Sequence, residues 1–249
     1  MRVRLLVAYD GAGFHGFAAQ PGQRTVAGVL AAAIEKVVRH PVDLVCAGRT
    51  DRGVHAWGQV VSADIDEHVD LGLLHRALLK LCGPELVVRE VATAAPDFHA
   101  RFSARGRTYR YTVLNRPVPD PFLASTTWHV AGPVELELLI LAGDPFLGEH
   151  DFGAFCRRPK AKPGDEPASL VRRVRRAEWT DLGEGVLRFE IEATAFCHQM
   201  VRSIVGTIVA AGRCELRAGD IRAILHRGER SGAAAVAPPH GLCLWHVEY

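Results

Sequence analysis

Strand-like and helix-like patterns alternate along the first 105 residues, and this alternation constrains the fold more than any other feature. Residues 2–10, 59–64 and 86–91 have the apolar content of strands. Thr25 is a predicted N-cap for a helix whose apolar residues recur at helical spacing, and Asp70 is a predicted N-cap for a second. We count about four strands and two helices in this part, an alternation that favours helices packed on a sheet.

The rest of the chain repeats this alternation, so we predict two similar halves of strands and helices, residues 1–105 and 106–249. A weak internal symmetry between the halves suggests a central cleft. A polar turn is expected at 148–152 and a mobile basic loop at 157–167. The predicted strands cover 107–114, 170–180, 186–195 and 242–249, and the predicted helices 134–142, 197–211 and 220–226.

Composition excludes several classes of protein. No run of about 18 apolar residues is present, so we expect no membrane span. The N-terminus enters a strand-like pattern directly, which favours a cytoplasmic location over export. Six cysteines are scattered without a Cys-x-x-Cys pair, which argues against a zinc cluster or a disulfide framework and fits reduced thiols. The twelve histidines show no metal-ligand spacing, so no metal is expected.

The stretch from Cys46 to Val61 carries the strongest chemical signal. Asp51 lies between Arg49 and Arg52, with a glycine on either side, in what reads as a tight loop between two strands. Two nearby cations favour the ionised form of a carboxyl group, which suits Asp51 to nucleophilic work. On composition alone, an aspartate that caps its own turn is the more frequent case.

A glycine-rich stretch, Gly11 to Gly16, follows the first predicted strand. It matches the Gly-x-Gly-x-x-Gly pattern of dinucleotide-binding folds, which need a helix to open at the third glycine. Here Pro21-Gly22 interrupts the chain before a helix can form. We therefore reject a nucleotide-cofactor oxidoreductase.

The formal net charge is only +2, but arginines cluster along the chain. Arginine forks match phosphate geometry, so the clusters at 101–110, 157–162 and 172–176 are candidates for binding an RNA backbone; solvated surface arginines are the alternative. Tyr109 and Tyr111 alternate with arginines on one predicted strand, where they could stack on nucleobases or pack against a helix.

Several short motifs follow one another along the chain. They are Tyr9-Asp10-Gly11, Gly48-Arg49-Thr50-Asp51 with Gly53-Val54-His55-Ala56, Asp97 to Ala104, Tyr109-Arg110-Tyr111, Phe196-x-His198-x-Met200-Val201-Arg202, and Ala237-Pro238-x-x-Gly241-Leu242-x-Leu244. Taken together, these motifs resemble those of tRNA pseudouridine synthases of the TruA type, in the family's order from residue 3 to residue 249. Position 52 departs from the family, since an arginine stands where a small residue is usual, and so does Phe17-Ala18-Ala19.

The resemblance implies a cofactor-free isomerisation of uridine to pseudouridine at positions 38, 39 and 40 of the tRNA anticodon stem-loop. It also implies a homodimer and the α+β pseudouridine synthase fold, in which the sheets of the two halves join into one, with helices on one side. Asp51 corresponds to the catalytic aspartate. The implied substrate-binding residues are Tyr109, Arg202, Arg49 and Leu244, and the RNA-backbone candidates are Arg101, Arg105, Arg157 and Arg158. The alternative is a non-catalytic tRNA-binding or tRNA-folding module on the same scaffold.

Overall fold

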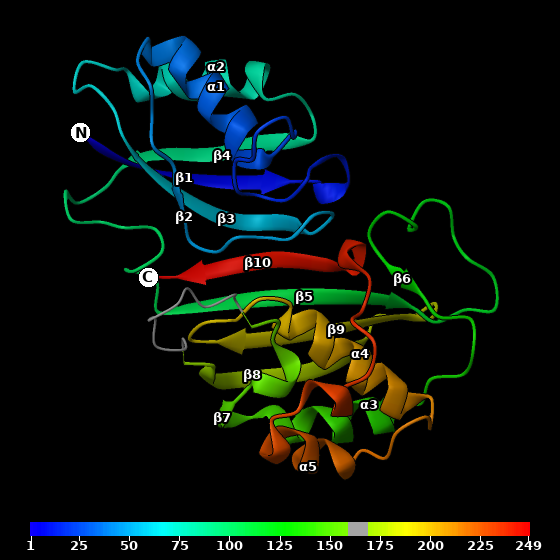
Figure 1. Cartoon of the computed structure of the whole chain (residues 1–249). Helices are drawn as coiled ribbons and strands as arrows, with labels where there is room; N and C mark the ends of the chain where they lie inside the picture. The colour runs from blue at the N-terminus through cyan, green and yellow to red at the C-terminus, as the bar shows by residue number, and fades with distance from the viewer. Residues whose placement is uncertain (159–168) are drawn as a thin grey trace. The chain divides into compact units, whose positions relative to one another are not determined.

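The computed structural model describes residues 1–158 and 169–249, so residues 159–167 of the predicted basic loop lie outside the described part. These residues form ten strands and five α-helices (Figure 1). This content confirms the predicted α+β class. The chain forms two compact units. Unit 1 contains residues Met1–Arg105 and Cys243–Tyr249, and unit 2 contains residues Gly106–Leu242. The division at 105/106 into independent domains stays a prediction.

Unit 1 is built on a sheet in the order β4-β1-β3-β10. β1 pairs antiparallel with both β3 and β4, whereas β10 runs parallel to β3, and the short β2 also pairs with β3. The strands of this sheet are β1 (Arg2–Tyr9), β2 (Val45–Cys46), β3 (His55–Asp64), β4 (Leu86–Thr93) and β10 (Leu242–Glu248).

Two helices lie together beside this sheet, α1 (Val26–Val38) and α2 (Leu71–Leu81) (Figure 1). Their N-caps are the predicted ones: the Thr25 hydroxyl accepts from the backbone N–H of Gly28, and the Asp70 carboxylate accepts from that of Leu73. Alternate residues of β1 are fully buried, which leaves one apolar face for the core.

Unit 2 contains a sheet in the order β5-β9-β8-β7, antiparallel throughout, with the short β6 parallel to β5. Its helix α3 packs on α4 and on β8, and α5 contacts β7. The elements are β5 (Gly106–Leu114), β6 (Trp128–His129), β7 (Gly148–Asp151), β8 (Val171–Asp181), β9 (Val186–Ala193), α3 (Leu136–Gly143), α4 (Met200–Gly212) and α5 (Asp220–Arg227).

Two expectations from the sequence are wrong in unit 2. The predicted polar turn at 148–152 is mostly strand β7, an edge strand that pairs with residues 171–174 of β8. An edge strand can be polar because one of its sides meets solvent. Cys156 and Cys197 form a disulfide, with their Cα atoms 5.8 Å apart, so the expectation of reduced thiols does not hold for this pair. The other four cysteines form no disulfide.

Candidate active site

Asp51 lies in the loop between β2 and β3, on a tight turn that its own backbone closes. The backbone N–H of Val54 donates to the Asp51 carbonyl at 3.1 Å, and Gly53 has a φ of +79°, a left-handed conformation that favours glycine. The Asp51 side chain is half-buried, whereas Arg49 and Arg52 are exposed. The turn therefore carries a half-buried aspartate that has an exposed arginine on either side of it in the sequence.

Thr50, the residue before Asp51, is buried and is anchored through both its side chain and its backbone. Its hydroxyl is 2.8 Å from the Tyr9 hydroxyl, and its carbonyl accepts from the backbone N–H of Phe17 at 3.1 Å. Gly16 allows this approach, because a Cβ there would lie 2.9 Å from the Thr50 carbonyl oxygen. The position of Asp51 is thus tied to β1 and to the Gly11–Gly16 loop.

Gln59 holds the start of the same loop from the middle of β3. Its side-chain amide donates to the Gly48 carbonyl at 2.7 Å and accepts from the Gly48 N–H at 3.4 Å. The amide also donates to the Tyr9 hydroxyl at 3.4 Å. Gln59 is fully buried. Removing it would leave buried polar groups unpaired, which costs about 1–3 kcal/mol for each group.

The glycine-rich stretch serves packing of the loop. Gly11 donates its N–H to Nδ1 of His55 at 3.1 Å, and a Cβ on Gly11 would lie 2.1 Å from the Val54 carbonyl oxygen. The stretch begins with a 3-10 turn at Gly11–Gly13, and no helix opens at Gly16, since α1 begins at Val26. The glycines let two backbone segments touch beside Asp51, which agrees with rejecting a dinucleotide site.

Two further predicted residues of unit 1, Leu244 and Arg101, lie near the ends of this loop. Leu244 is fully buried on β10, where it is paired in register with Ala56 of β3. Burial raises the pKa of the Cys46 thiol to about 11, while the positive charges of Arg49 and Arg101 act in the opposite direction. Both arginines therefore lie close enough to Cys46, at the entry to the loop, to act on the same thiol.

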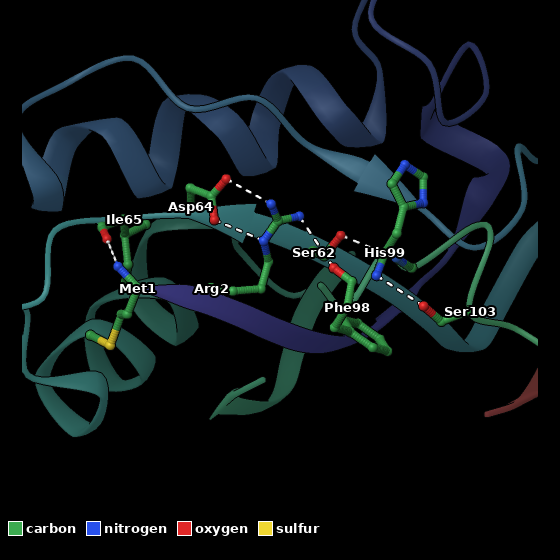
Figure 2. A network of polar contacts seen from close by, with 9 residues as sticks. Met1, Arg2, Ser62, Asp64, Ile65, Phe98, His99 and Ser103 are labelled. Carbon is green, nitrogen blue, oxygen red and sulfur yellow. Dashed lines mark hydrogen bonds and ion pairs between the residues drawn. The ribbon is translucent and has the colours of Figure 1, made fainter. Parts of the chain in front are cut away.

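The segment that carries Arg101 is held firmly to the sheet (Figure 2). Arg2 donates from Nη1 to the Phe98 carbonyl at 3.2 Å, and the Ala100 N–H donates to the Ser62 hydroxyl at 3.2 Å. Arg101 is exposed on this segment, and so is Arg105, whose backbone N–H donates to the Glu248 carbonyl.

Tyr109 and Tyr111 lie on β5 of unit 2, and both are buried. The Tyr109 ring meets Phe196 edge to face, with 5.0 Å between ring centroids. The Tyr111 hydroxyl donates to the Pro238 carbonyl at 2.8 Å, and its burial raises the pKa of the phenol above the ordinary range. Tyr111 is thus a packing residue, whereas Tyr109 keeps 8% of its surface exposed.

Arg202 lies on α4 and is half-buried. Its Nε donates to the Ala237 carbonyl at 2.7 Å, and its own carbonyl accepts from the Ala237 N–H at 3.1 Å. Its positive charge also opposes the upward shift of the Tyr111 pKa. These contacts fix Arg202 against the segment that leads into β10.

The arginine clusters of unit 2 differ in how their charge is balanced. Arg110 and Arg176 pair with Glu190, Arg175 pairs with Glu192 at 3.4 Å, and Arg173 pairs with Glu149 at 3.3 Å. Arg157 and Arg158 are exposed, and no carboxylate of residues 1–158 or 169–249 pairs with them. They are therefore better placed to attract an anion.

A family model described as tRNA pseudouridine synthase matches residues 5–103 and 142–249. The chain is 42% identical over 251 residues to tRNA pseudouridine synthase A of Frankia casuarinae, covering all of this chain and 89% of that protein. It is 35% identical to the protein of the same name from Pseudothermotoga lettingae, in a match that covers 100% of this chain and 99% of that protein. The chain belongs to the tRNA pseudouridine synthase family.

Other members of this family give comparable matches, such as the Corynebacterium glutamicum enzyme at 42% identity over 264 residues. Among solved structures, the chain is similar to one titled a Cbf5–Nop10–Gar1 complex, with a TM-score of 0.36 and 15% identity. That match covers 83% of this chain and 45% of the other.

None of the helices among the described residues has both the length and the apolar content that a membrane span needs.

Sequence reasoning assigned no role to the buried partners of the loop, Thr50 and Gln59, or to Arg230 in unit 2. One feature of the sequence could have identified Gln59, because it is a polar residue at the start of an apolar run. No such feature marks Arg230, because it lies outside the arginine clusters described above.

Proposed function

We propose that this member of the tRNA pseudouridine synthase family isomerises uridines 38, 39 and 40 of the tRNA anticodon stem-loop to pseudouridine, with Asp51 as the nucleophile. The observation that carries the assignment of Asp51 is its turn, which buried hydrogen bonds hold through the neighbouring Thr50 and, at Gly48, through Gln59. A nucleophile held in one geometry removes much of the entropic barrier to attack.

The reaction breaks the N1–C1′ glycosidic bond and forms a C5–C1′ bond in the same nucleotide. Asp51 attacks the ribose or the base to permit the detachment, and the uracil then turns. The bond to Asp51 breaks again before the pseudouridine leaves, so the carboxylate is regenerated. The proton on C5 leaves and N1 gains one, so the isomerisation balances without an oxidant or another co-substrate.

The other predicted site residues have roles that fit this chemistry. Arg202 would keep Asp51 anionic, because an opposite charge nearby favours the ionised carboxyl group. Tyr109 would stack on the extruded uracil and help to remove the C5 proton. A base in a stem must leave its stack, at a cost of a few kcal/mol, and Arg49 would brace the vacated space. Leu244 would line the base pocket.

Further proposals concern partners and location. Arg101 and Arg105 would contact the RNA backbone, which positions the substrate without reading its sequence. We also propose a homodimer that acts in the cytoplasm. Sedimentation equilibrium tests the dimer, and a mass equal to one chain at micromolar concentration would contradict it.

The decisive experiment is tritium release from tRNA labelled at uracil C5. Asp51→Asn keeps the size of the side chain and removes its charge, so we expect the rate to fall by about 10³-fold or more while tRNA binding persists. Asp43→Asn, an exposed aspartate of the same unit, is the matched control and should match wild type. Substrates that retain only one uridine among positions 38, 39 and 40 test the sites of modification.

Two outcomes would contradict the proposal in different ways. Equal release by wild type and Asp51→Asn would remove Asp51 from the chemistry. Binding of tRNA without tritium release by either protein would favour the non-catalytic tRNA-binding module.

A further inference from the structure

Unit 2 contains an open cavity of about 500 Å³ that the sequence motifs do not mark. It lies between the segment after β7, the N-terminal end of α4 and the turn after α5. We call it the arginine pocket, and define it by the lining residues Gly153, Cys156, Arg157, Arg158, Gln199 and Arg230.

Positive charge dominates the arginine pocket. Three of its lining residues are arginines with exposed side chains, and none of its described lining residues is acidic. Asp151 lies beside Gly153, but its Oδ1 accepts from the Gly153 N–H at 2.8 Å and its charge acts on Arg172. Three guanidinium groups around one cavity repel each other, so a bound anion would stabilise the arrangement.

The walls of the pocket are joined to each other. The Cys156–Cys197 disulfide links the segment after β7 to the residues before α4, and the Arg157 N–H donates to the His198 carbonyl at 2.9 Å. Across the pocket, Arg230 donates from Nη2 to Oε1 of Gln199 at 3.0 Å. This bond orients the Gln199 amide, whose nitrogen stays a donor.

We propose that the arginine pocket binds one phosphate of the tRNA backbone, with Arg230 and Gln199 as residues of the subsite beside Arg157 and Arg158. The proposal rests on the proposed function, since it names a further contact for the same substrate. Guanidinium forks match phosphate oxygens, and amide N–H groups complete such sites. The described lining contains no aromatic residue, so it offers no stacking surface for a base.

The salt dependence of tRNA binding tests this subsite. Each phosphate contact contributes about 0.7 to the slope of log K against log[salt] for single strands and about 0.9 for duplex. We expect Arg230→Gln to reduce the slope by about that amount between 50 and 200 mM KCl, whatever the tRNA sequence. Arg222→Gln removes an exposed arginine of α5 outside the pocket and should leave the slope unchanged.

Kinetics give a second readout. At saturating tRNA, Arg230→Gln should release tritium at the wild-type rate, while its KM rises several-fold. Arg230→Lys keeps the charge, and should restore the salt slope and part of the affinity. Gln199→Ala should raise KM by a smaller factor, and thermal melts of each variant show whether the fold is kept.

The proposal fails if Arg230→Gln, with an unchanged melt, has the same salt slope and KM as Arg222→Gln. That failure is distinct from failure of the proposed function. If the wild-type protein releases tritium and Arg230→Gln leaves the salt slope unchanged, only the phosphate subsite is overturned. If Arg230→Gln reduces the salt slope but the wild-type protein releases no tritium, the pocket is supported in a protein that binds tRNA without catalysis.

Discussion

The Asp51 loop of unit 1 and the arginine pocket of unit 2 present charged groups in opposite ways. Thr50 and Gln59 are buried, and hydrogen bonds of their side chains hold the backbone before Asp51, at Thr50 and at Gly48. Around the pocket, Arg157 and Arg158 extend from the surface. The Asp51 loop fixes the position of a reacting group, whereas the arginine pocket supplies positive charge that attracts an anion.

This difference separates two kinds of functional residue. Bond making depends steeply on geometry, because a displacement of 1 Å can cost about 10²-fold in rate. Attraction of a phosphate depends on charge and tolerates exposed, long side chains. Changes beneath the Asp51 loop should therefore lower kcat, whereas changes around the pocket should raise KM.

Among changes to the residues that support the Asp51 loop, Gly11→Ala should produce the largest effect, because the new Cβ would lie 2.1 Å from the Val54 carbonyl oxygen. Either the glycine-rich loop or the Asp51 turn must then move, so we expect tritium release to fall about 10²-fold. Overpacking should also lower the free energy of unfolding by about 1–3 kcal/mol. Steady-state kinetics and urea melts measure the two effects.

Gly219→Ala provides the control for Gly11→Ala, since a Cβ there meets no atom within 4 Å. Wild-type kinetics in Gly11→Ala would show that contact between these backbone segments is unimportant for the position of Asp51. The contrast between a fixed loop and a charged surface would then lose its basis.

Gln59→Leu should have the next largest effect. It keeps the side chain's approximate size and leaves the Gly48 carbonyl and N–H without their buried partner. We expect about a tenfold lower kcat, a KM for tRNA within about twofold of wild type, and a loss of about 1–3 kcal/mol of stability. Gln23→Leu, at an exposed glutamine, is the control. A change in KM without a change in kcat would contradict a positioning role.

Local signals in the sequence predicted much of the fold. Thr25 and Asp70 precede apolar residues at helical spacing, and both cap helices as expected. The segment 148–151 has no apolar alternation, so nothing in its composition identified it as strand β7. Its pairing with β8 supplies the structure that its own residues do not encode.

The candidate site was predictable in part for the same reason. Asp51 and its glycines form one local pattern, but the Tyr9–Thr50 and Tyr9–Gln59 hydrogen bonds join residues 41 and 50 positions apart. The arginine pocket likewise draws Arg158 and Arg230 from distant segments. Such partners are selected by the fold, and no spacing rule within a single sequence connects them.

The Cys156–Cys197 disulfide gives the last prediction, and the smallest effect on catalysis. Titration of the denatured protein without reductant should find four thiols, those of cysteines 46, 82, 214 and 243, and six after reduction. Closing a loop across 41 positions stabilises a protein by at most about 4 kcal/mol, so a Cys156→Ser/Cys197→Ser variant should melt at a lower temperature.

Because the disulfide joins the pocket walls but lies outside the Asp51 loop, the same double variant should keep its kcat and raise its KM about twofold. The Arg157–His198 backbone bond still joins the walls, which limits the change. If the titration found six thiols without reductant, Cys156 and Cys197 would be reduced, and the Arg157–His198 backbone hydrogen bond would join the pocket walls without a disulfide. A large fall in kcat would instead mean that the pocket helps to position the reacting nucleotide, and the division between a region that positions and a region that attracts would have to be given up.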